Sequence, residues 1–374
     1  MKITKIVALS AAVGVVLSGV ALTTSASAEP VSNSYVAVGS DTLQDSMNAL
    51  INGTNASGSF VRVTAGSMTL GNFDAFGSAA VQTKPAGPYF GRPAGSGAGR
   101  DALRRSIDGA SWTAANNTTP AKIITGQVDI ARSSSGAGNN ANSAGKLLYV
   151  PYGRDAVGYA YKGGNASWAN LTPAQLKSIY EGTLTSVGGI TVKPRLPQKD
   201  SGTRSFFLSA INVTTPSGVP DEQTTSLPEN DASVLGANEI IPFSVANWVS
   251  QANNVSGVNT LALPAAAGVQ LGSPVAGQVP FTGSAPNLVP SAGFYGDAKF
   301  GRDTYLIVER SRVEAGFTGG TNPFDPTLAA LVDPTKPNSL TNFGAAAFRP
   351  GAVKTKFGFL APSSTTPIPA YVNG

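Results

Sequence analysis

The chain contains no cysteine and no histidine, and charged residues make up only 13% of its 374 residues. Without cysteine it forms no disulfide and has no reactive thiol, and without either residue it lacks the usual zinc ligands. The absence of histidine also excludes Ser-His-Asp and Cys-His catalysis. Binding or catalysis must therefore use carboxylates, hydroxyls, backbone amides, lysine, arginine or aromatic rings, and we expect neither a metal nor a cofactor.

The net charge is weak, at +5 for the whole chain. The sequence has no block of lysine and arginine interleaved with aromatic residues, so we expect no nucleic-acid partner. Hydrophobic residues make up 41% of the chain, which is enough for a large core. The 43 glycines and 26 prolines exceed the average share but stay below the level typical of disorder.

The first 28 residues have the pattern of a secretory signal peptide. Lys2 and Lys5 form a basic start, residues 6–22 are apolar, and Ala26-Ser27-Ala28 is a small-residue cleavage site. We expect cleavage after Ala28 and a secreted protein, extracellular or periplasmic. No cysteine follows the apolar stretch, so we expect no lipid anchor. The alternative is an uncleaved segment that anchors the chain in a membrane.

Short apolar strands alternate with helical patterns along the rest of the chain, which predicts an α/β fold. Strands are expected at residues 35–38, 128–131, 147–150, 156–161, 190–193 and 304–308. The stretch from 261 to 293 is rich in proline, glycine and alanine, and we interpret it as long loops.

Two helix starts can be placed from the sequence. The first helix is indicated by an apolar stripe at helical spacing, formed by Leu43, Met47, Leu50 and Ile51. Asp41 or Thr42 is predicted to be its N-cap. Another helix is predicted to begin with Thr172 as N-cap and Pro173 in the first helical position.

Four turns rich in glycine, serine and threonine occur in this pattern, at residues 40–42, 96–99, 132–135 and 201–203. A helix start exposes unpaired backbone N–H groups and the positive end of the helix dipole. Glycines let these amides approach a ligand, and hydroxyls add further donors. One such turn is typical of plain helix capping. Together, with Arg132 and Arg204 beside two of them, they predict a shared oxyanion site.

In order and spacing, these segments resemble the phosphate-binding (PstS-like) proteins of bacterial ABC transporters, in the type II periplasmic-binding-protein superfamily. The matching segments are VGSDTL at 38–43, GSGAG at 95–99, VDIARSS at 128–134, LTPAQLKSIYEG at 171–182 and DSGTRSFF at 200–207. The resemblance implies two α/β lobes that close about a hinge on one phosphate. Lobe I would comprise residues 29–155 and 296–374, and lobe II residues 156–295.

The resemblance also implies ligand contacts. The residues that match the family's contacts are Thr42, the Leu43 amide, Ser96, Ser201, the Gly202 amide and Thr203. With the polar neighbours of these turns, the candidate ligand-binding residues are Ser40, Asp41, Thr42, Leu43, Ser96, Arg132, Ser133, Ser134, Ser201, Gly202, Thr203 and Arg204.

The sequence departs from the family pattern at two positions. Ser134 stands where the family commonly has an aspartate that accepts the proton of hydrogen phosphate, and our hypothesis is that Asp41 takes over this role. Pro197 stands where the family has an arginine four residues before the Ser-Gly-Thr serine. Arg204 or Arg132 is expected to supply that charge, with Arg195 as a weaker candidate.

Two groups of charged residues are interpreted as structural. Arg154 and Asp155 precede an apolar strand and are expected to form a structural ion pair near the hinge, with a contact to the ligand as the alternative. Asp297, Arg302 and Asp303 are expected to be solvated or to lie at the hinge.

We expect a monomeric solute-binding protein, not an enzyme, that captures inorganic phosphate and delivers it to an ABC permease. One alternative is that the same fold binds sulfate or another oxyanion, because Ser134 replaces the family's aspartate. A second alternative is a secreted hydrolase of phosphate esters, with a serine or threonine nucleophile and Asp41 as its base.

Overall fold

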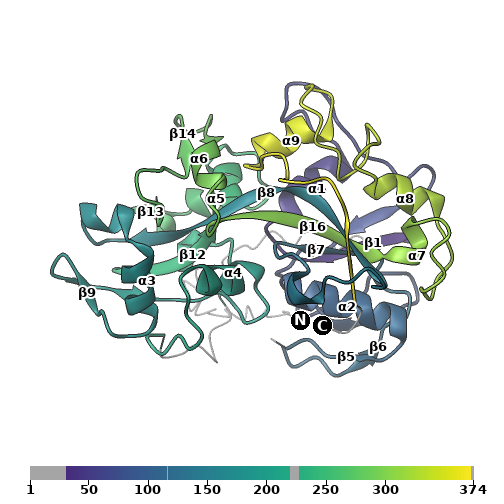
Figure 1. Ribbon diagram of the computed structural model, residues 1–374, viewed down its shortest axis with the longest axis horizontal. Helices are drawn as coiled ribbons and strands as arrows, with labels where there is room; N and C mark the ends of the chain where they lie inside the picture. The colour runs from purple at the N-terminus through teal and green to yellow at the C-terminus, as the bar shows by residue number, and fades with distance from the viewer. Residues whose placement is uncertain (1–30, 116, 220–226, 372–374) are drawn as a thin grey trace, which may run out of the picture.

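The computed structural model describes residues 31–115, 117–219 and 227–371, so the expected signal peptide lies outside the described residues. Two lobes lie side by side and are joined by the long strand β8 (Leu147–Lys162) and its partner β16 (Gly301–Glu309) (Figure 1). The expected two-lobed α/β fold is confirmed. Within these ranges, no helix combines the length and the apolar character needed to cross a membrane.

One mixed sheet of nine strands runs through both lobes. The strand order is β11–β12–β8–β16–β7–β1–β2, and β13 and β17 also pair with β8. Besides β8 and β16, its strands are β1 (Tyr35–Gly39), β2 (Leu70–Asn72), β7 (Ile130–Ser133), β11 (Lys193–Pro194), β12 (Glu239–Ser244), β13 (Val269–Gly272) and β17 (Ile368–Ala370). Strand β1 is parallel to β2 and β7, whereas β16 is antiparallel to β7 and β8.

Strand β8 is one element of 16 residues, where the sequence predicts two strands. Its first part pairs with β16 and its last part pairs with β12 and β13. All its residues except Arg154 and Lys162 are buried. Because partner strands accompany it along its whole length, the chain has no reason to turn at residues 152–155. The polar residues that suggested a turn form ion pairs with β16 instead.

Four two-stranded ribbons lie outside the main sheet. They are β3 (Ala80–Val81) with β4 (Phe90–Gly91), β5 (Ser111–Trp112) with β6 (Lys122–Ile123), β9 (Ser186–Val187) with β10 (Ile190–Thr191), and β14 (Phe281–Thr282) with β15 (Val289–Pro290). The interpretation of residues 261–293 as long loops is therefore wrong in part, because β13, β14 and β15 fall inside this stretch.

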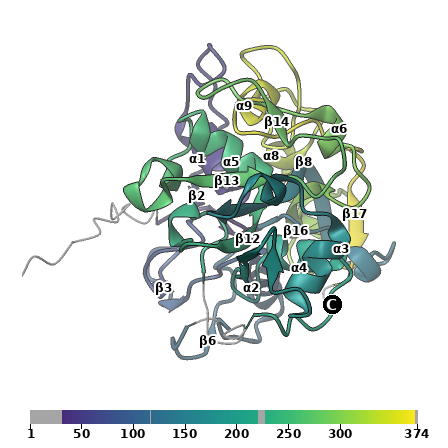
Figure 2. The same ribbon diagram turned by 90° about the vertical axis from the view of Figure 1, so that its left-hand side faces the viewer.

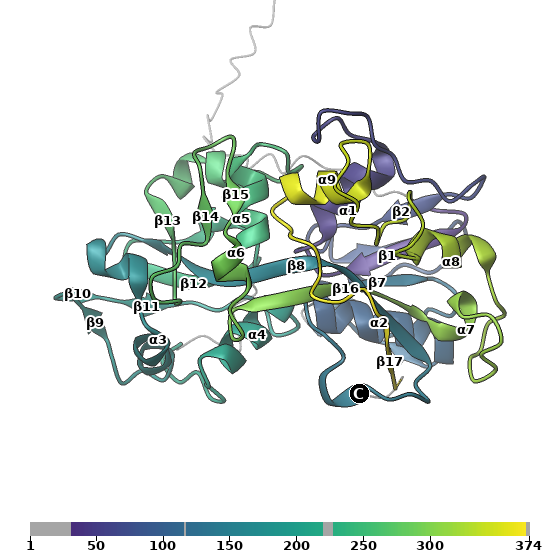
Figure 3. The ribbon, with the colours of Figure 1, turned by 45° about the horizontal axis from the view of Figure 1, so that its top comes forward.

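In the first lobe, helices cover both faces of the sheet (Figures 1 and 3). The helices are α1 (Gln44–Asn52), α2 (Ser96–Asp108), α7 (Arg310–Val313), α8 (Pro326–Val332) and α9 (Pro350–Lys356). Tyr35 and Ala37 of β1 pack in one hydrophobic cluster with α1, α8 and α9, whereas Val36 and Val38 pack in another with α2. This alternation is the period of two that a strand buried on both faces requires.

The second lobe has its own hydrophobic cluster, drawn from residues 156–300. Its helices are α3 (Pro173–Tyr180), α4 (Gly202–Ala210), α5 (Val245–Ala252) and α6 (Ala292–Tyr295). Helices α3 and α4 lie on one side of β12, and α5 lies on the other (Figure 2). Short 3-10 turns complete the elements, at η1 (Gly138–Asn140), η2 (Ala166–Asn170), η3 (Ala232–Val234), η4 (Thr260–Ala262) and η5 (Pro264–Ala266).

The predicted start of α3 is confirmed. Thr172 is the N-cap, its hydroxyl accepts from the Gln175 amide, and the Gln175 side chain accepts from the Thr172 amide. Pro173 occupies the first helical position. This reciprocal pair satisfies two of the N–H groups that a helix start leaves unpaired.

Candidate functional site

The first of the four expected turns lies at the carboxyl end of β1, the edge where open α/β sheets bind their ligands. The chain enters it through Gly39, whose φ of +109° favours glycine. A Cβ on Gly39 would also lie 2.6 Å from the carbonyl oxygen of Arg132. The Ser40 amide donates to that same oxygen at 3.0 Å, and the Thr42 amide donates to Ser40 Oγ at 3.3 Å. The turn is thus held by its own backbone and by β7.

This geometry directs two side chains of the turn towards the second lobe. The N-cap of α1 is Leu43, with no side-chain cap, so the prediction that Asp41 or Thr42 caps this helix is wrong. Thr42 Oγ1 instead accepts from Arg302 Nη2 at 3.5 Å. Asp41 Oδ2 accepts from Asn247 Nδ2, on α5 of the second lobe, at 3.4 Å.

The second and third turns meet through serine hydroxyls. Ser96 is the first residue of α2, and Ser134 directly follows β7. Ser96 Oγ accepts from the Ser134 amide at 2.9 Å and lies 3.1 Å from Ser134 Oγ. Both residues are buried. The Ser133 hydroxyl, by contrast, donates to the Ser135 carbonyl within its own loop, at 2.7 Å.

The fourth turn brings the second lobe against these serines. Ser201 is the N-cap of α4, and its Oγ accepts from the Arg204 amide at 3.0 Å. Gly202 follows, and a Cβ there would lie 2.4 Å from both Ser96 Oγ and Ser134 Oγ. Glycine is therefore required for the two lobes to come this close, and turns from both lobes share one site.

The centre of this site is Arg302, on β16. Its Nη2 donates to Thr203 Oγ1 at 2.8 Å and lies 3.5 Å from Thr42 Oγ1, so one guanidinium joins a hydroxyl from each lobe. The side chain is only 3% exposed. Its Nη1 is buried and has no hydrogen-bond partner among the described residues. A buried charged donor without an acceptor is costly, so this atom is suited to an anionic ligand.

Arg302 is held in place by Asp155, which lies directly opposite it on β8. Asp155 Oδ2 accepts from Nε at 3.1 Å and from Nη2 at 2.8 Å. Asp155 also accepts from the Ser244 hydroxyl and the Ala246 amide, both at 3.0 Å, and so binds the start of α5. The carboxylate is fully hydrogen-bonded, as a buried charge must be.

The sequence interpretation of Arg302 as a solvated or hinge charge is wrong with respect to solvation, because the residue is buried. A signal was present in the sequence. Gly-Arg-Asp occurs three times, at 99–101, 153–155 and 301–303. Antiparallel pairing of the last two tripeptides sets each arginine opposite an aspartate, which gives the pairs Arg154–Asp303 and Arg302–Asp155.

Arg132 serves the backbone of the first lobe. Its guanidinium is fully buried, and its five N–H groups donate to the oxygens of Ser40, Ala37, Gly39, Phe73 and Asn72. Burial lowers the pKa of Arg132 to about 10, so it is still charged at neutral pH. With its donors used in this way, Arg132 holds the first turn in place.

Arg204 and Arg195 are the other candidates to replace the family's arginine at position 197. Both form contacts within the second lobe. Arg204 Nη1 donates to the carbonyl oxygen of Pro197 at 2.9 Å, and burial lowers the pKa of Arg204. Arg195 pairs with Glu239 at 2.9 Å. Among these arginines, Arg302 is thus the one whose hydrogen bonds reach hydroxyls of both lobes.

Asp41 lies in an acidic environment. Burial raises its pKa well above its usual range, and the neighbouring Glu229 raises it further, while Arg302 and Arg132 oppose the rise. Glu229 is a residue that sequence reasoning missed, in a stretch without a motif. It is 1% exposed, and burial raises its pKa as well.

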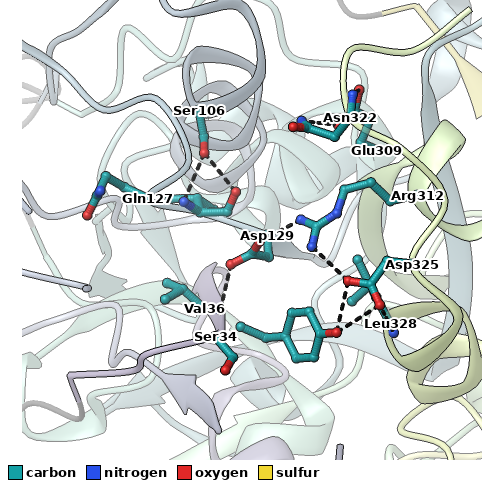
Figure 4. A network of polar contacts seen from close by, with 12 residues as sticks. Ser34, Val36, Ser106, Gln127, Asp129, Glu309, Arg312, Asn322, Asp325 and Leu328 are labelled. Carbon is teal, nitrogen blue, oxygen red and sulfur yellow. Dashed lines mark hydrogen bonds and ion pairs between the residues drawn. The ribbon is translucent and has the colours of Figure 1, made fainter. Parts of the chain in front are cut away.

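A separate polar network lies at the amino ends of β1 and β7, away from the four turns (Figure 4). Asp129 accepts from the Val36 amide at 3.0 Å and pairs with Arg312 at 2.5 Å. Arg312 also pairs with Asp325 at 3.1 Å, and Tyr35 Oη donates to that carboxylate at 2.8 Å. These contacts connect α7 and α8 to the sheet and have a structural role.

Comparisons with known proteins identify a family for this chain. A family model described as a PBP superfamily domain matches residues 24–324. No curated protein sequence matches the chain.

Two solved structures are among those that are similar to this chain. PfluDING, a periplasmic phosphate-binding protein with bound phosphate, is 16% identical, with a TM-score of 0.46 over 88% of this chain and 91% of its own. An ABC-type phosphate transport receptor from Vibrio cholerae is 15% identical, with a TM-score of 0.43 over 75% of this chain and 88% of its own. With four-fifths of its length matched by the family model, and with two lobes that meet around one polar site, the chain belongs to the PBP superfamily of periplasmic-binding proteins.

Proposed function

We propose that this chain is a secreted solute-binding protein that captures inorganic phosphate between its two lobes. The observation that carries the proposal is the position of Arg302. Its Nη2 contacts Thr42 and Thr203, one from each lobe, and its buried Nη1 has no partner among the described residues. An anion oxygen is the acceptor with which a guanidinium makes its strongest hydrogen bonds.

The groups around Arg302 suit a tetrahedral oxyanion. The serine hydroxyls of Ser96 and Ser134 lie against Gly202, the first residue of α4. A dianion that leaves water must have its hydration replaced by donors, and hydroxyls together with helix-start amides supply them. Phosphate, with four oxygens, can meet donors from several turns at once. The motifs that resemble phosphate-binding proteins favour it over other oxyanions.

We also propose the setting in which this binding occurs. The leader would be removed after Ala28, and the mature chain would act as a monomer that delivers phosphate to an ABC permease. Lobe I would comprise residues 29–155 and 296–374, and lobe II residues 156–295. The change from one hydrophobic cluster to another between Tyr152 and Ala156 supports the first boundary. Phe300 still packs in the second-lobe cluster, which favours a return crossing a few residues later than Tyr295.

Binding without catalysis fits these contacts better than ester hydrolysis. A serine or threonine nucleophile needs a base within hydrogen-bond reach. In the described ranges, the Asp41 carboxylate accepts from the side-chain amide of Asn247 and not from a hydroxyl. The hydroxyls of Thr42 and Thr203 contact Arg302, which is a donor and not a base.

Isothermal titration calorimetry with phosphate tests the proposal. The mature chain, unfolded and refolded to remove bound anion, should bind one phosphate per chain. Thr42→Val and Thr203→Val, which remove a hydroxyl and keep the shape, should each weaken binding by about 10- to 100-fold. Thr341→Val is the matched control, because Thr341 is buried and its hydroxyl donates to Val332 in the first lobe. If phosphate gave no heat of binding with the wild-type protein, the proposal would be refuted.

A further inference from the structure

Helix α1 of the first lobe contacts the second lobe through Asp45. Ser256, which follows α5, lies within hydrogen-bond distance of the Asp45 carboxyl group. The neighbouring Val255 packs against the hydrophobic cluster of the first lobe that contains α1. A polar and an apolar contact therefore join the lobes outside the four turns of the candidate site.

The segment that carries Ser256 is fixed to the second lobe. The Ser256 amide donates to the carbonyl oxygen of Ser250, on α5, at 3.3 Å. Asn253 accepts from the Leu288 amide at 2.7 Å and donates to the Leu288 carbonyl at 3.0 Å. Ser256 must therefore move with the second lobe, whereas Asp45 moves with the first.

The Ser256 hydroxyl faces two oxygens that need a donor. Ser256 Oγ lies within hydrogen-bond distance of Asp45 Oδ2, and it lies 2.6 Å from the carbonyl oxygen of Val258. It also accepts from the Val258 amide at 3.2 Å. A hydroxyl has one hydrogen and can donate to one of the two oxygens. Both contacts are satisfied when Asp45 is protonated and donates to Ser256 Oγ, while the hydroxyl donates to the Val258 carbonyl.

The surroundings of Asp45 favour the same protonated form. Burial raises the pKa of Asp45 to about 6; the hydrogen bond with Ser256 opposes this rise, and the negative charge of Asp74 adds to it. Asp74 follows β2 and accepts from the Asn48 side chain, on α1, at 3.1 Å. Arg132, on β7, is a positive charge that interacts with Asp45, but its guanidinium donates to oxygens of the first lobe. The contact from the second lobe is with Ser256, which is uncharged.

We propose that Asp45 and Ser256 form a clasp that stabilises the closed state of the two lobes, so that phosphate affinity depends on the proton of Asp45. The inference rests on the proposed function, in which phosphate binds between the lobes. When the lobes separate, Ser256 leaves Asp45 and water reaches the carboxyl group, so ionisation costs less than in the closed state. Protonation therefore favours the closed state. Asp45 acts on the anion through the lobes and is a positioning residue.

The clasp sets the pH range over which the affinity changes. Its contribution is complete below about pH 4, near the pKa of an exposed aspartate. The contribution is lost as the pH rises through about 6, the pKa of Asp45 in the closed state. Asp45→Asn stays neutral at every pH, and its amide can donate to Ser256 Oγ as the protonated acid does. The affinity of this variant relative to wild type should therefore rise with pH.

Calorimetry with inorganic phosphate at about pH 4 and about pH 7 tests the clasp. Each variant is compared with wild type at the same pH, so that the ionisation of phosphate itself cancels. Asp45→Asn should bind phosphate about as tightly as wild type at the lower pH, and about 5- to 100-fold more tightly at the higher pH. Asp108→Asn is the matched control, because Asp108 pairs with Arg105 at the end of α2 remote from Ser96. It should match wild type at both pH values.

Ser256→Ala removes the other half of the clasp. It should weaken phosphate binding by about 3- to 10-fold at the lower pH, because one hydrogen bond between the lobes is lost. Ser311→Ala is its control, since the Ser311 hydroxyl donates to the Asn322 carbonyl within the first lobe at 2.8 Å. The inference is overturned if the affinity of Asp45→Asn relative to wild type is the same at both pH values, or if Ser256→Ala keeps the wild-type affinity at the lower pH.

Small-angle X-ray scattering of the refolded mature protein without phosphate separates this inference from the proposed function. Wild-type protein should have a larger radius of gyration at about pH 7 than at about pH 4, whereas Asp45→Asn should have the same radius at both. Wild-type protein that binds no phosphate at either pH would refute the proposed function. Equal radii of gyration for wild type and Asp45→Asn at the higher pH would then overturn the clasp as well.

Discussion

Asp155 and Arg302 are cross-strand neighbours on β8 and β16, at the place where both strands pass from one lobe to the other. Their ion pair is almost fully buried, with 0% and 3% side-chain exposure. Asp155 orients the guanidinium, whose Nη2 also contacts hydroxyls from both lobes. A pair at the lobe boundary therefore connects the sheet to the candidate binding site.

Replacing Arg302 by lysine tests this role. Lysine keeps the charge that Asp155 needs, but one ammonium cannot donate to Asp155, Thr203 and an anion with the geometry of a guanidinium. We expect phosphate affinity to fall by at least about tenfold, while the protein stays folded. Arg310→Lys is the control, since Arg310 forms a partly exposed pair with Glu314 on α7. Calorimetry measures the affinity, and unchanged affinity in Arg302→Lys would argue against a direct contact.

Gly202→Ala tests whether phosphate binding requires Gly202 of the second lobe to lie against the two serines of the first lobe. A Cβ at Gly202 would lie 2.4 Å from Ser96 Oγ and Ser134 Oγ, so overpacking should oppose closure. Alanine is a better helix former than glycine, so the second lobe itself should not lose stability. We expect phosphate affinity to fall by about 10- to 100-fold, with no drop in melting temperature.

The control for this substitution is Gly257→Ala, where an added Cβ meets nothing within 4 Å. It should leave both the affinity and the melting temperature unchanged. Full phosphate affinity in Gly202→Ala would mean that the bound state does not bring the turns as close as they are here.

The stability of the protein should depend on pH through Asp45, on α1. It accepts a hydrogen bond from Ser256, which follows α5, and burial raises its pKa from 3.8 to about 6. Protonated Asp45 contributes favourably to the free energy of unfolding. This contribution is complete below about pH 4 and is lost as the pH rises through about 6. Asp45→Asn should therefore have a higher free energy of unfolding than wild type at pH 7. The shift in pKa sets an upper limit of about 3 kcal/mol on this difference. The actual difference should be smaller, because the side chain is partly exposed.

Urea unfolding at several pH values checks this expectation. The stabilities of wild type and Asp45→Asn should be alike near pH 4 and diverge as the pH rises. A difference of the same size at both ends of the range would show that the ionisation of Asp45 is not the cause.

Tyr35→Phe should lower the stability of the protein without changing its phosphate affinity. Tyr35 Oη donates to the Asp325 carboxylate at 2.8 Å and 2.9 Å, in the network at the amino ends of β1 and β7 (Figure 4). Its loss should cost about 1–2 kcal/mol of unfolding free energy, because the acceptor is charged but partly exposed. Phosphate affinity should not change, since this network is remote from the four turns. A parallel loss of affinity would show that the two ends of the sheet are coupled.

The local parts of this fold could be predicted from the sequence. The strand, turn and helix at 35–51, the capped start of α3 and the serine turns depend on neighbours in the chain, and their residue types signal them directly. The proximity of Ser96, Ser134 and Gly202 could also be predicted, because the turns that contain them occur in a recognisable order.

The parts that depend on distant pairing could not be predicted in the same way. Strand β8 continues through residues 152–155 because β16, far along the chain, pairs with it. Arg302 is buried because the Gly-Arg-Asp tripeptides at 153–155 and 301–303 lie antiparallel in register. Glu229 is buried in a stretch without a periodic pattern, so no local signal marks it. In each case the missing information was the strand register or the packing of one lobe on the other.

The most direct test of the central claim is a crystal structure of the refolded mature protein with phosphate. We expect one tetrahedral anion between the lobes, within hydrogen-bond distance of Arg302 Nη1, with the hydroxyls of Thr42 and Thr203 around it. An anion bound elsewhere, or an Arg302 that keeps to Asp155 without touching the phosphate, would contradict the claim.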